Sequence, residues 1–477
     1  MSQKKTEIDS LFWHRGEVAV PSGHKLLSTQ NETLPAGVTN AYLFAMFNAL
    51  SFQIVLSAPM VLYAKSLGAS ATVLGVIVGM MPLLVIFQIP AAQYVARVGY
   101  KRFVFAGWGM RVVMIFFMAV VPITFSFLNA ANRLALILIL LFAFNLSRGI
   151  SSAGWLPWIT SIVPASVRGQ YLSREAGAVN LASFTTYGVS GICLAGGQPR
   201  AWQFALLFLF SAIMGAISLH FLKRIPEAEI PEEVRTSRQP VPWMELIRFP
   251  PFQKLVATVV AWSLAYGGIT AFTVAFLKTS VAMPEGQVLF VSSIFFLGGL
   301  SSLWIIGARL DFLGSKPVLT FSFSAWFVIC LVWAGIAGHF IRPGVGLILI
   351  LQLAMGLFAA LTNMSNTRLA MGIIPEMGRN HFFAIFSVFG NLSLGLAPII
   401  WGLMIDGIGD LHFSWAGADW NAYTIFFTAA GGVMLLSLFL SRRLFEPEAA
   451  RMQTLLHEIL VQSPQRILVR IWPREDR

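Results

Sequence analysis

About twelve hydrophobic stretches, each long enough to cross a bilayer, fill most of this 477-residue chain. A spanning helix needs roughly 20 apolar residues, because the hydrocarbon core of a bilayer is about 30 Å thick. Lipid offers the backbone no hydrogen-bond partners, and the stretches lack the alternating pattern of strands, so the sequence predicts an all-α membrane protein. The expected spans are residues 39–64, 71–96, 102–124, 134–162, 174–198, 202–222, 252–277, 286–308, 317–338, 343–372, 381–407 and 421–441.

These stretches form two resembling sets of six. Pro164 and Pro375 open the clearest matching segments, PASVRGQY and PEMGRNHF, which lie 211 positions apart. Gly99 and Gly314 open a second pair, GYK and GSK, which lie 215 positions apart. Internal repeats of this size are typical of secondary transporters, in which two similar bundles move around a site held between them. The repeat therefore predicts a protein that moves a solute across a membrane.

Five segments follow from this pattern. They are a cytosolic N-terminal segment (1–38), a first six-helix bundle (39–222), a cytosolic linker (223–251), a second six-helix bundle (252–441) and a cytosolic amphipathic tail (442–477). In the tail, apolar residues recur at helical spacing from Met452 to Leu460. This helix is expected either to lie on the inner leaflet or to pack on the linker.

The composition and charge of the chain restrict its environment. Only 11% of the residues are charged, whereas soluble domains carry about 25%. Most of the 33 Lys and Arg residues fall on the side of the expected spans that also holds both termini. This positive-inside pattern predicts cytosolic termini in the plasma membrane, or in the inner membrane of a bacterium. The basic residues are too scattered to indicate nucleic-acid binding, whereas lipid head groups are expected partners.

A loop motif appears at the same place in each half. Residues 307–316, GARLDFLGSK, resemble the cytosolic loop motif G-x-x-x-D-[RK]-x-G-[RK]-[RK] of the major facilitator superfamily. The matching residues are Gly307, Asp311, Gly314 and Lys316. In residues 92–101 of the first half, the matching residues are Arg97, Gly99 and Lys101, while Ala92 and Ala96 replace the usual Gly and Asp. The chain thus resembles this superfamily over roughly residues 39 to 441.

The resemblance implies two six-helix bundles around a central cavity that opens alternately to either side. In that family the loop Asp helps to hold the cytosolic side closed, a role that Asp311 can play and Ala96 cannot. A carboxylate is favoured both by a helix N-terminus and by a nearby guanidinium. Arg168 and Arg379, the repeated arginines, are candidate partners of this gate, although they can equally be ordinary positive-inside charges.

Arg148, near the middle of the fourth expected span, is the first candidate substrate residue. A guanidinium at that depth costs at least about 2.5–3.5 kcal/mol unless it is paired or faces water. Arg148 is therefore expected either to contact an acidic group of the solute or to be paired structurally. Arg111 in the third span is expected to be paired internally. Three arginines inside spans, with few acids, indicate an anionic or strongly hydrogen-bonding solute.

Further candidates come from the fourth, seventh and tenth spans. Trp262 and Tyr266 share a helix face and can stack on a solute. Trp155 is a candidate on the fourth span, whereas its neighbour Trp158 is expected first to be an interface anchor. Glu175 is a candidate for coupling to protons. The remaining candidate substrate-binding residues are Asn145, Ser152, Asn363, Asn366 and Arg368.

The sequence therefore predicts a monomeric secondary active or facilitative transporter of a small organic, and by these arginines anionic, solute, driven by protons or another ion. One alternative is a multidrug exporter, although the fifth span lacks the exporters' G-P-x-x-G-G run. The other is a transporter-like chaperone or sensor that does not transport. Motifs of metalloproteases, nucleotide-binding loops and serine hydrolases are absent, so an enzyme is not expected. Cys193 and Cys330 lie in apolar runs, and neither a metal nor another cofactor is predicted.

Overall fold

The computed structural model of the chain describes residues 37–163, 168–196, 199–228, 248–305, 313–373, 379–415, 417–444, 446 and 452–457. The first half consists of α2 (Val38–Leu56), α3 (Ala58–Ser66), α4 (Ala71–Leu84), η1 (Val85–Phe87), α5 (Gln88–Val98), α6 (Tyr100–Val120), η2 (Val121–Ser126), α7 (Ala130–Ile162), α8 (Arg168–Cys193) and α9 (Ala201–Arg224). The second half consists of α12 (Pro250–Thr279), α13 (Glu285–Ile305), α15 (Ser315–Ala337), α16 (Val345–Ile373), α17 (Arg379–Ile408) and α18 (Ala422–Arg442). Two short strands, β1 (Phe413–Trp415) and β2 (Ala418–Trp420), and a tail helix, α19 (Met452–His457), complete the described elements.

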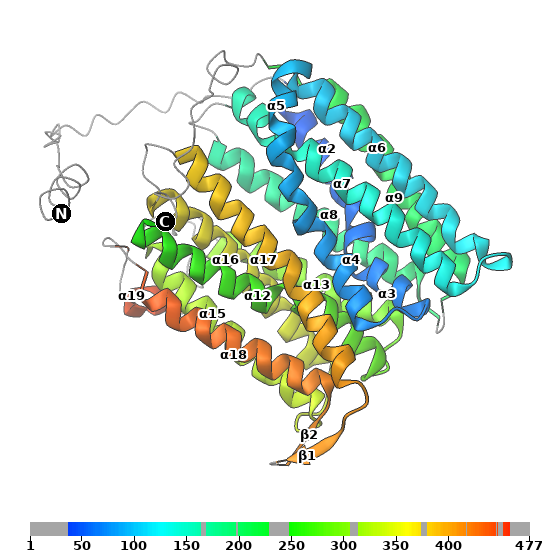
Figure 1. Cartoon of the computed structure of the whole chain (residues 1–477), viewed down its shortest axis with the longest axis vertical. Helices are drawn as coiled ribbons and strands as arrows, with labels where there is room; N and C mark the ends of the chain where they lie inside the picture. The colour runs from blue at the N-terminus through cyan, green and yellow to red at the C-terminus, as the bar shows by residue number, and fades with distance from the viewer. Residues whose placement is uncertain are drawn as a thin grey trace, which may run out of the picture. The chain divides into compact units, whose positions relative to one another are not determined.

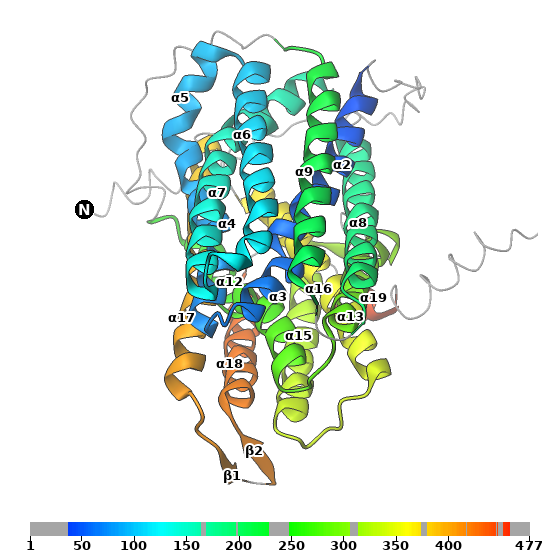
Figure 2. The ribbon, with the colours of Figure 1, turned by 90° about the vertical axis from the view of Figure 1, so that its right-hand side faces the viewer.

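The all-α fold class is confirmed. Within the described residues, ten helical spans are long and apolar enough to cross a membrane. Helices α8 and α13 run beside them and pack against each other (Figures 1 and 2). When α3 is joined to α2, η1 and α5 to α4, and η2 to α6, the described residues of each half form six long helical segments, as the repeat predicts.

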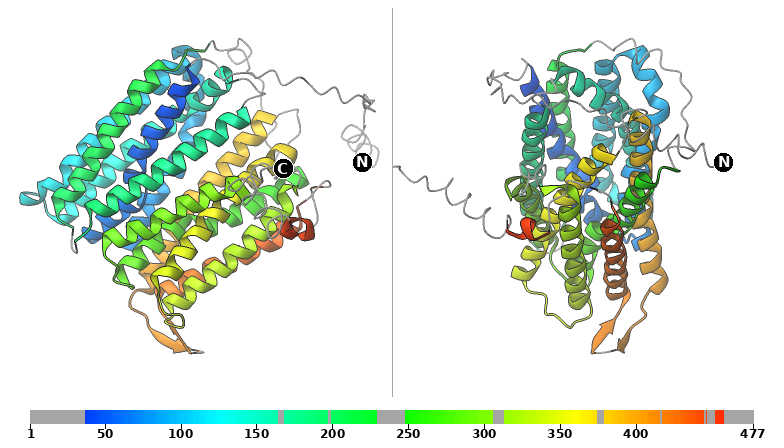
Figure 3. Two further views of the ribbon diagram at one scale, coloured as in Figure 1. Left: turned by 180° about the vertical axis from the view of Figure 1, so that it is seen from behind. Right: turned by 90° about the vertical axis from the view of Figure 1, so that its left-hand side faces the viewer.

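The most extensive contacts between the two halves are those of α4 with α17, α8 with α13, and α3 with α12. We call the end of the bundle where α3 ends and α4 begins the α3 end, and the opposite end, where α5 ends, the α5 end. At the α5 end, α5 packs on α6 and α7 of its own half. The ribbons of the two halves draw apart toward that end (Figure 3). The described contacts between the halves are thus concentrated toward the α3 end.

The first predicted span is interrupted. Ser57 has an extended backbone (φ −133°, ψ −156°), and α3 begins at Ala58 with Pro59 in its first turn. A proline has no backbone N–H and clashes with the preceding turn of a helix, so it fits best in the first turn, where Pro59 lies. The uninterrupted apolar pattern of residues 39–64 did not predict this break. It places a helix N-terminus in the interior of the bundle.

The repeated glycines occupy matching backbone positions. Gly99 (φ 91°, ψ 148°) precedes α6, and Gly314 (φ 80°, ψ 163°) precedes α15. Residues with a side chain rarely adopt such positive φ values, which explains why both copies of the motif have glycine here. In the second half, Glu446 accepts hydrogen bonds from the backbone N–H groups of Ser315 (2.9 Å) and Lys316 (2.6 Å), just after Gly314.

A β-hairpin between α17 and α18, outside the predicted spans, extends from the α3 end (Figure 2). Strand alternation places Ser414 and Asp419 on one face, where they form a 2.7 Å hydrogen bond, and three aromatic residues on the other. Asp419 also contacts His339 at 3.3 Å. The hydrogen bond from Ser414, together with His339, lowers the pKa of the Asp419 carboxyl. The aromatic residues are Phe413, Trp415 and Trp420.

In the tail, α19 covers part of the predicted amphipathic helix. Its Leu455 is fully buried in a cluster with Leu313, Val318 and Leu361. This side chain therefore packs against the second half. The tail beyond His457, and residues 229–247 of the predicted linker, lie outside the described residues.

Candidate functional site

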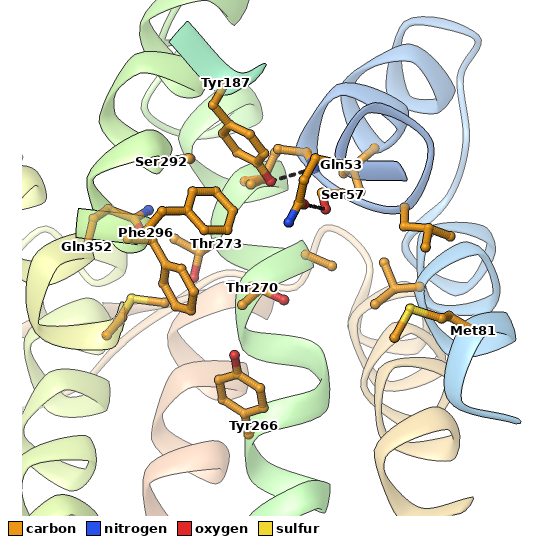
Figure 4. A pocket seen from close by; sticks show the side chains of 18 of the residues that line it. Gln53, Ser57, Met81, Tyr187, Tyr266, Thr270, Thr273, Ser292, Phe296 and Gln352 are labelled. Atoms are coloured by element: carbon orange, nitrogen blue, oxygen red, sulfur yellow. Dashed lines mark hydrogen bonds between the residues drawn. The ribbon is translucent and has the colours of Figure 1, made fainter. Parts of the chain in front are cut away.

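A cavity of about 300 Å³ lies between the two halves (Figure 4). Its walls come from α2, α3, α4 and α8 of the first half and from α12, α13 and α16 of the second. Small-molecule sites in proteins begin at about this volume and combine mostly apolar walls with a few placed polar groups. The described residues that line the cavity include hydroxyl, amide, aromatic and aliphatic side chains but no charged one.

On the first-half wall, the polar groups are already hydrogen-bonded to one another. Gln53 donates to Ser183 at 2.8 Å and accepts from Ser57 at 2.6 Å. The Tyr187 hydroxyl accepts from the backbone N–H of Ala58 at 3.2 Å, at the N-terminus of α3. The break in the first span therefore gives this wall its shape, and Figure 4 shows the hydrogen bond between Ser57 and Gln53 close to the Tyr187 ring.

On the second-half wall, two buried hydroxyl groups have no such partners. The Thr273 and Ser292 hydroxyls are buried and form no hydrogen bond within the described part of the chain. Gln352, also buried, lines the cavity beside them. A buried polar group without a partner costs about 1–3 kcal/mol. A solute that hydrogen-bonds to these groups removes that cost.

Aromatic rings form the rest of the lining. Tyr266 stacks on Trp262, with ring centroids 4.7 Å apart and an angle of 16° between the ring planes. Phe296 of α13 meets Tyr187 of α8 edge-on at 5.0 Å, across the two halves. Tyr266, Phe296 and Tyr187 line the cavity, whereas Trp262 supports Tyr266 from behind.

Tyr266 is the predicted substrate residue that the structure places in the cavity lining. Arg148 is not among the described lining residues, and it lies close enough to Arg111 for their charges to repel. The Arg111 guanidinium sits 4.9 Å from the centroid of the Trp108 ring and 4.7 Å from that of Phe144, so it is held partly by cation–π contacts. No carboxylate pairs with it among the described ion pairs.

The other candidates on the fourth span lie inside the first half. Asn145 is buried and donates to the Leu141 carbonyl, and Ser152 donates to the Gly149 carbonyl, so both bond to their own helix. The ring centroid of Trp155 lies 4.8 Å from that of Phe44 and 6.1 Å from that of Trp158. Trp158 is fully buried and donates to the Pro226 carbonyl. The prediction that Trp158 anchors the chain at the membrane–water interface therefore does not fit its buried position.

The candidates on the tenth span lie toward the α5 end of α16. Arg368 forms an ion pair with Glu446 at 2.7 Å and a hydrogen bond to Ser315 at 3.2 Å. Asn363 is exposed, whereas Asn366 is buried. The Arg368 contacts tie α16 to the start of α15, so this guanidinium has a structural partner within its own half.

The predicted gating residues are described only in part. Arg97 is exposed and lies 5.8 Å from the ring centroid of Tyr94, and Lys101 lies in the first turn of α6. Gly307 and Asp311 lie outside the described residues, as do the side chains of Arg168 and Arg379. The predicted roles of Asp311, Arg168 and Arg379 stay predictions.

Glu175, the candidate coupling residue, is on α8 and is not among the residues that line the cavity. Its carboxyl lies beside the hydroxyl of Tyr171, whose ring stacks on Tyr42 at 5.1 Å. Its role in coupling stays a prediction.

Comparison with known proteins identifies the family. A model of the Major Facilitator Superfamily matches residues 41–284 and 268–472, which together cover most of the chain. The chain belongs to the Major Facilitator Superfamily. It is a multi-pass membrane transporter and not an enzyme.

Solved structures show the same fold. A mutant of the nucleoside transporter NupG is similar with a TM-score of 0.66 and 14% identity, over 86% of this chain and 100% of that one. The xylose transporter XylE from E. coli, in an inward open conformation, is similar with a TM-score of 0.65 and 15% identity, over 87% and 98%. A D-xylose–proton symporter is similar with a TM-score of 0.65 and 15% identity, over 84% of this chain and 96% of that one. A search of curated proteins found no match.

Sequence reasoning missed most of the cavity. Gln53, Tyr187, Thr273, Ser292 and Gln352 line it, yet none was among the predicted site residues. Each is a neutral polar residue within an apolar span, and Tyr187 and Ser292 stand directly beside other hydroxyl residues. A search for isolated Gln, Tyr, Ser and Thr residues in every span would have included them, but it would also have returned many residues that bond only to their own helix.

Proposed function

We propose that this protein moves a small, neutral, hydrogen-bonding solute across the membrane by alternating access, with the cavity between the two halves as the solute site. The observation that carries the proposal is the cavity itself, which takes its walls from both halves and, among the described residues, combines apolar side chains with uncharged polar ones. A site shared by two bundles is exposed to opposite sides in turn when the bundles rock. The transporters of nucleosides and xylose that share the fold act on neutral hydroxylated solutes.

A neutral solute fits this lining better than the anionic one that the arginines suggested. A carboxylate in the cavity would lose its hydration without gaining a cationic partner, which is expensive. A hydroxyl or amide group of a neutral solute can bond to Thr273, Ser292 and Gln352, while Tyr266 and Phe296 cover its apolar parts. With the positive-inside orientation, the α5 end faces the cytosol.

Counterflow in proteoliposomes tests the proposal, with D-xylose, uridine and succinate as probes. We expect D-xylose or uridine to be exchanged and succinate to be excluded. Thr273→Val and Ser292→Ala should each lower kcat/KM about 5–10-fold for the exchanged probe, because each removes one hydrogen bond. Thr258→Val and Ser293→Ala are matched controls on the same helices, since both hydroxyls bond to backbone carbonyls of their own helix.

Two results would contradict the proposal. Exchange of succinate but not of the neutral probes, abolished by Arg148→Lys, would overturn the neutral-solute proposal in favour of the anionic one. Equal losses in the Thr273 and Ser292 variants and in their controls would show that these hydroxyls act through stability instead of solute contact.

A further inference from the structure

The N-terminus of α4 is capped by a residue from the other half of the protein. Asp406, near the end of α17, accepts hydrogen bonds from the backbone N–H of Ala71 at 2.9 Å and of Thr72 at 2.8 Å. The hydroxyl groups of Ser70 and Thr72 face the same carboxylate. The first N–H groups of a helix lack partners within it and attract negative charge. A carboxylate 335 positions away in the sequence thus supplements the local cap, in which the Ser70 hydroxyl accepts from the backbone N–H of Val73 at 3.4 Å.

Below this cap, α4 and α17 pack backbone against backbone. A Cβ atom on Gly402, one turn before Asp406, would lie 2.5 Å from the Ala71 carbonyl oxygen. A Cβ atom on Gly75 would lie 2.1 Å from the carbonyl oxygen of Pro398. Neither contact leaves room for a side chain. Asp406 therefore caps α4 only while the two helices are in this close contact.

We propose that Asp406 is the latch that holds the two halves together at the α3 end, and that it releases α4 each time the cavity opens on that side. The proposal rests on alternating access as proposed above, and it assigns a positioning residue to that cycle. When α4 and α17 separate, the carboxylate and the N–H groups of Ala71 and Thr72 lose their partners together. The latch thus stabilises the state closed at the α3 end relative to the state open there.

Spin-label distances measure this equilibrium directly. One pair is placed at Phe127→Cys and Phe340→Cys, exposed loop positions of the two halves. Cys193 and Cys330 are replaced by alanine in the full-length chain, in nanodiscs. We expect Asp406→Asn to raise the ratio of the longer to the shorter distance about threefold, because the amide keeps one acceptor oxygen but loses the negative charge that a helix N-terminus favours by about 0.3–1 kcal/mol. Asp406→Glu, which keeps the carboxylate, should restore part of the wild-type ratio.

Asp410→Asn is the matched control, because Asp410 is exposed, lies one turn further along and makes the same charge change. It should leave the distance ratio at the wild-type value. Identical distance distributions for wild type, Asp406→Asn and Asp410→Asn would overturn the latch. An equal shift in both variants would also overturn it, because it would show a general charge effect.

A second label pair, Tyr94→Cys and Lys254→Cys at the α5 end, separates failure of the latch from failure of the proposed function. If alternating access holds, saturating D-xylose or uridine changes the distances of at least one pair in the wild type. If neither pair changes although counterflow is measured, alternating access itself fails. If the pairs respond to solute but not to Asp406→Asn, the latch alone fails.

Discussion

The two long interfaces between the halves, α4–α17 and α8–α13, are related by the internal repeat but are closed differently. Ala71 and Gly286 lie 215 positions apart, and Ala195 and Asp406 lie 211 apart, the same spacings that relate the repeated motifs. In the first interface, Asp406 caps the helix that starts at Ala71. In the second, a Cβ atom on Gly286 would lie 3.2 Å from the Cα of Ala195, so backbone contact replaces the carboxylate.

The start of α13 explains why this interface has no second latch. Glu285 is the first residue of α13 and forms a 2.6 Å ion pair with Lys278. A carboxylate at position 195 would therefore face an acidic residue at the helix N-terminus it was meant to cap. The glycine is nevertheless retained, since Gly191 and Gly402 are also 211 positions apart and both approach the partner backbone. Packing is shared by the two interfaces, whereas the charged cap belongs to one.

The strongest way to break this comparison is Gly75→Ala. The new Cβ would lie 2.1 Å from the Pro398 carbonyl oxygen, so α4 and α17 must move apart. We expect a cost of about 3 kcal/mol to the state closed at the α3 end, seen as a shift to longer distances between labels at 127 and 340. Gly432→Ala on α18 is the control, because its Cβ would meet nothing within 4 Å. Equal behaviour of the two variants would show that the α4–α17 contact does not hold the halves together.

A second carboxylate cap, Glu446, tests whether a cap must join the two halves in order to affect the distance between them. It caps α15 as Asp406 caps α4, but its three described partners, Ser315, Lys316 and Arg368, all lie in the second half. Glu446→Gln should lower the free energy of unfolding by about 2 kcal/mol, because the half-buried Arg368 loses a charged hydrogen-bond partner. It should leave the distance ratio at the α3 end unchanged. Thermal unfolding of Glu446→Gln, Arg368→Ala and the double variant isolates the contribution of the Glu446–Arg368 ion pair to stability. A change in the ratio of label distances at the α3 end would contradict the distinction between a cap within one half and a cap that joins the two halves.

Ionic strength gives the smallest effect. Asp406 is largely exposed, so raising salt from about 0.1 M to 1 M shortens the screening length from about 10 Å to 3 Å and weakens its interaction with the start of α4. The longer-distance population should rise less than twofold in the wild type and should not change in Asp406→Asn. A salt response of equal size in both proteins would locate the effect elsewhere.

Much of the fold could be read from the sequence, because each span obeys the same local rule of length and hydropathy. The expected spans agree with the observed helices to within a few residues at most boundaries. The break at Ser57 escaped, because Pro59 lies in an apolar run that continues on both sides. The short hairpin of β1 and β2 escaped because it lies in a connection outside the spans.

The site was predicted less well, for a different reason. Arg148 and Arg368 attracted attention because a charge in a span is expensive, yet Arg368 is paired with Glu446, a residue 78 positions later that no span pattern links to it. Tyr266 was found by its spacing from Trp262 on one helix face. Thr273 and Ser292 carry no such signal, since a hydroxyl side chain in a helix often bonds to the backbone of its own helix.

The sequence by itself determined that this chain crosses the membrane many times and is built from two copies of one bundle. Both properties depend on local hydropathy and on residue identity at fixed spacings. Only the tertiary structure decided which neutral side chains face the cavity, which arginine has a partner, and that Asp406 reaches the start of α4. Those outcomes depend on how separate helices cross and rotate against one another, and contacts between residues hundreds of positions apart leave no periodic pattern in the chain.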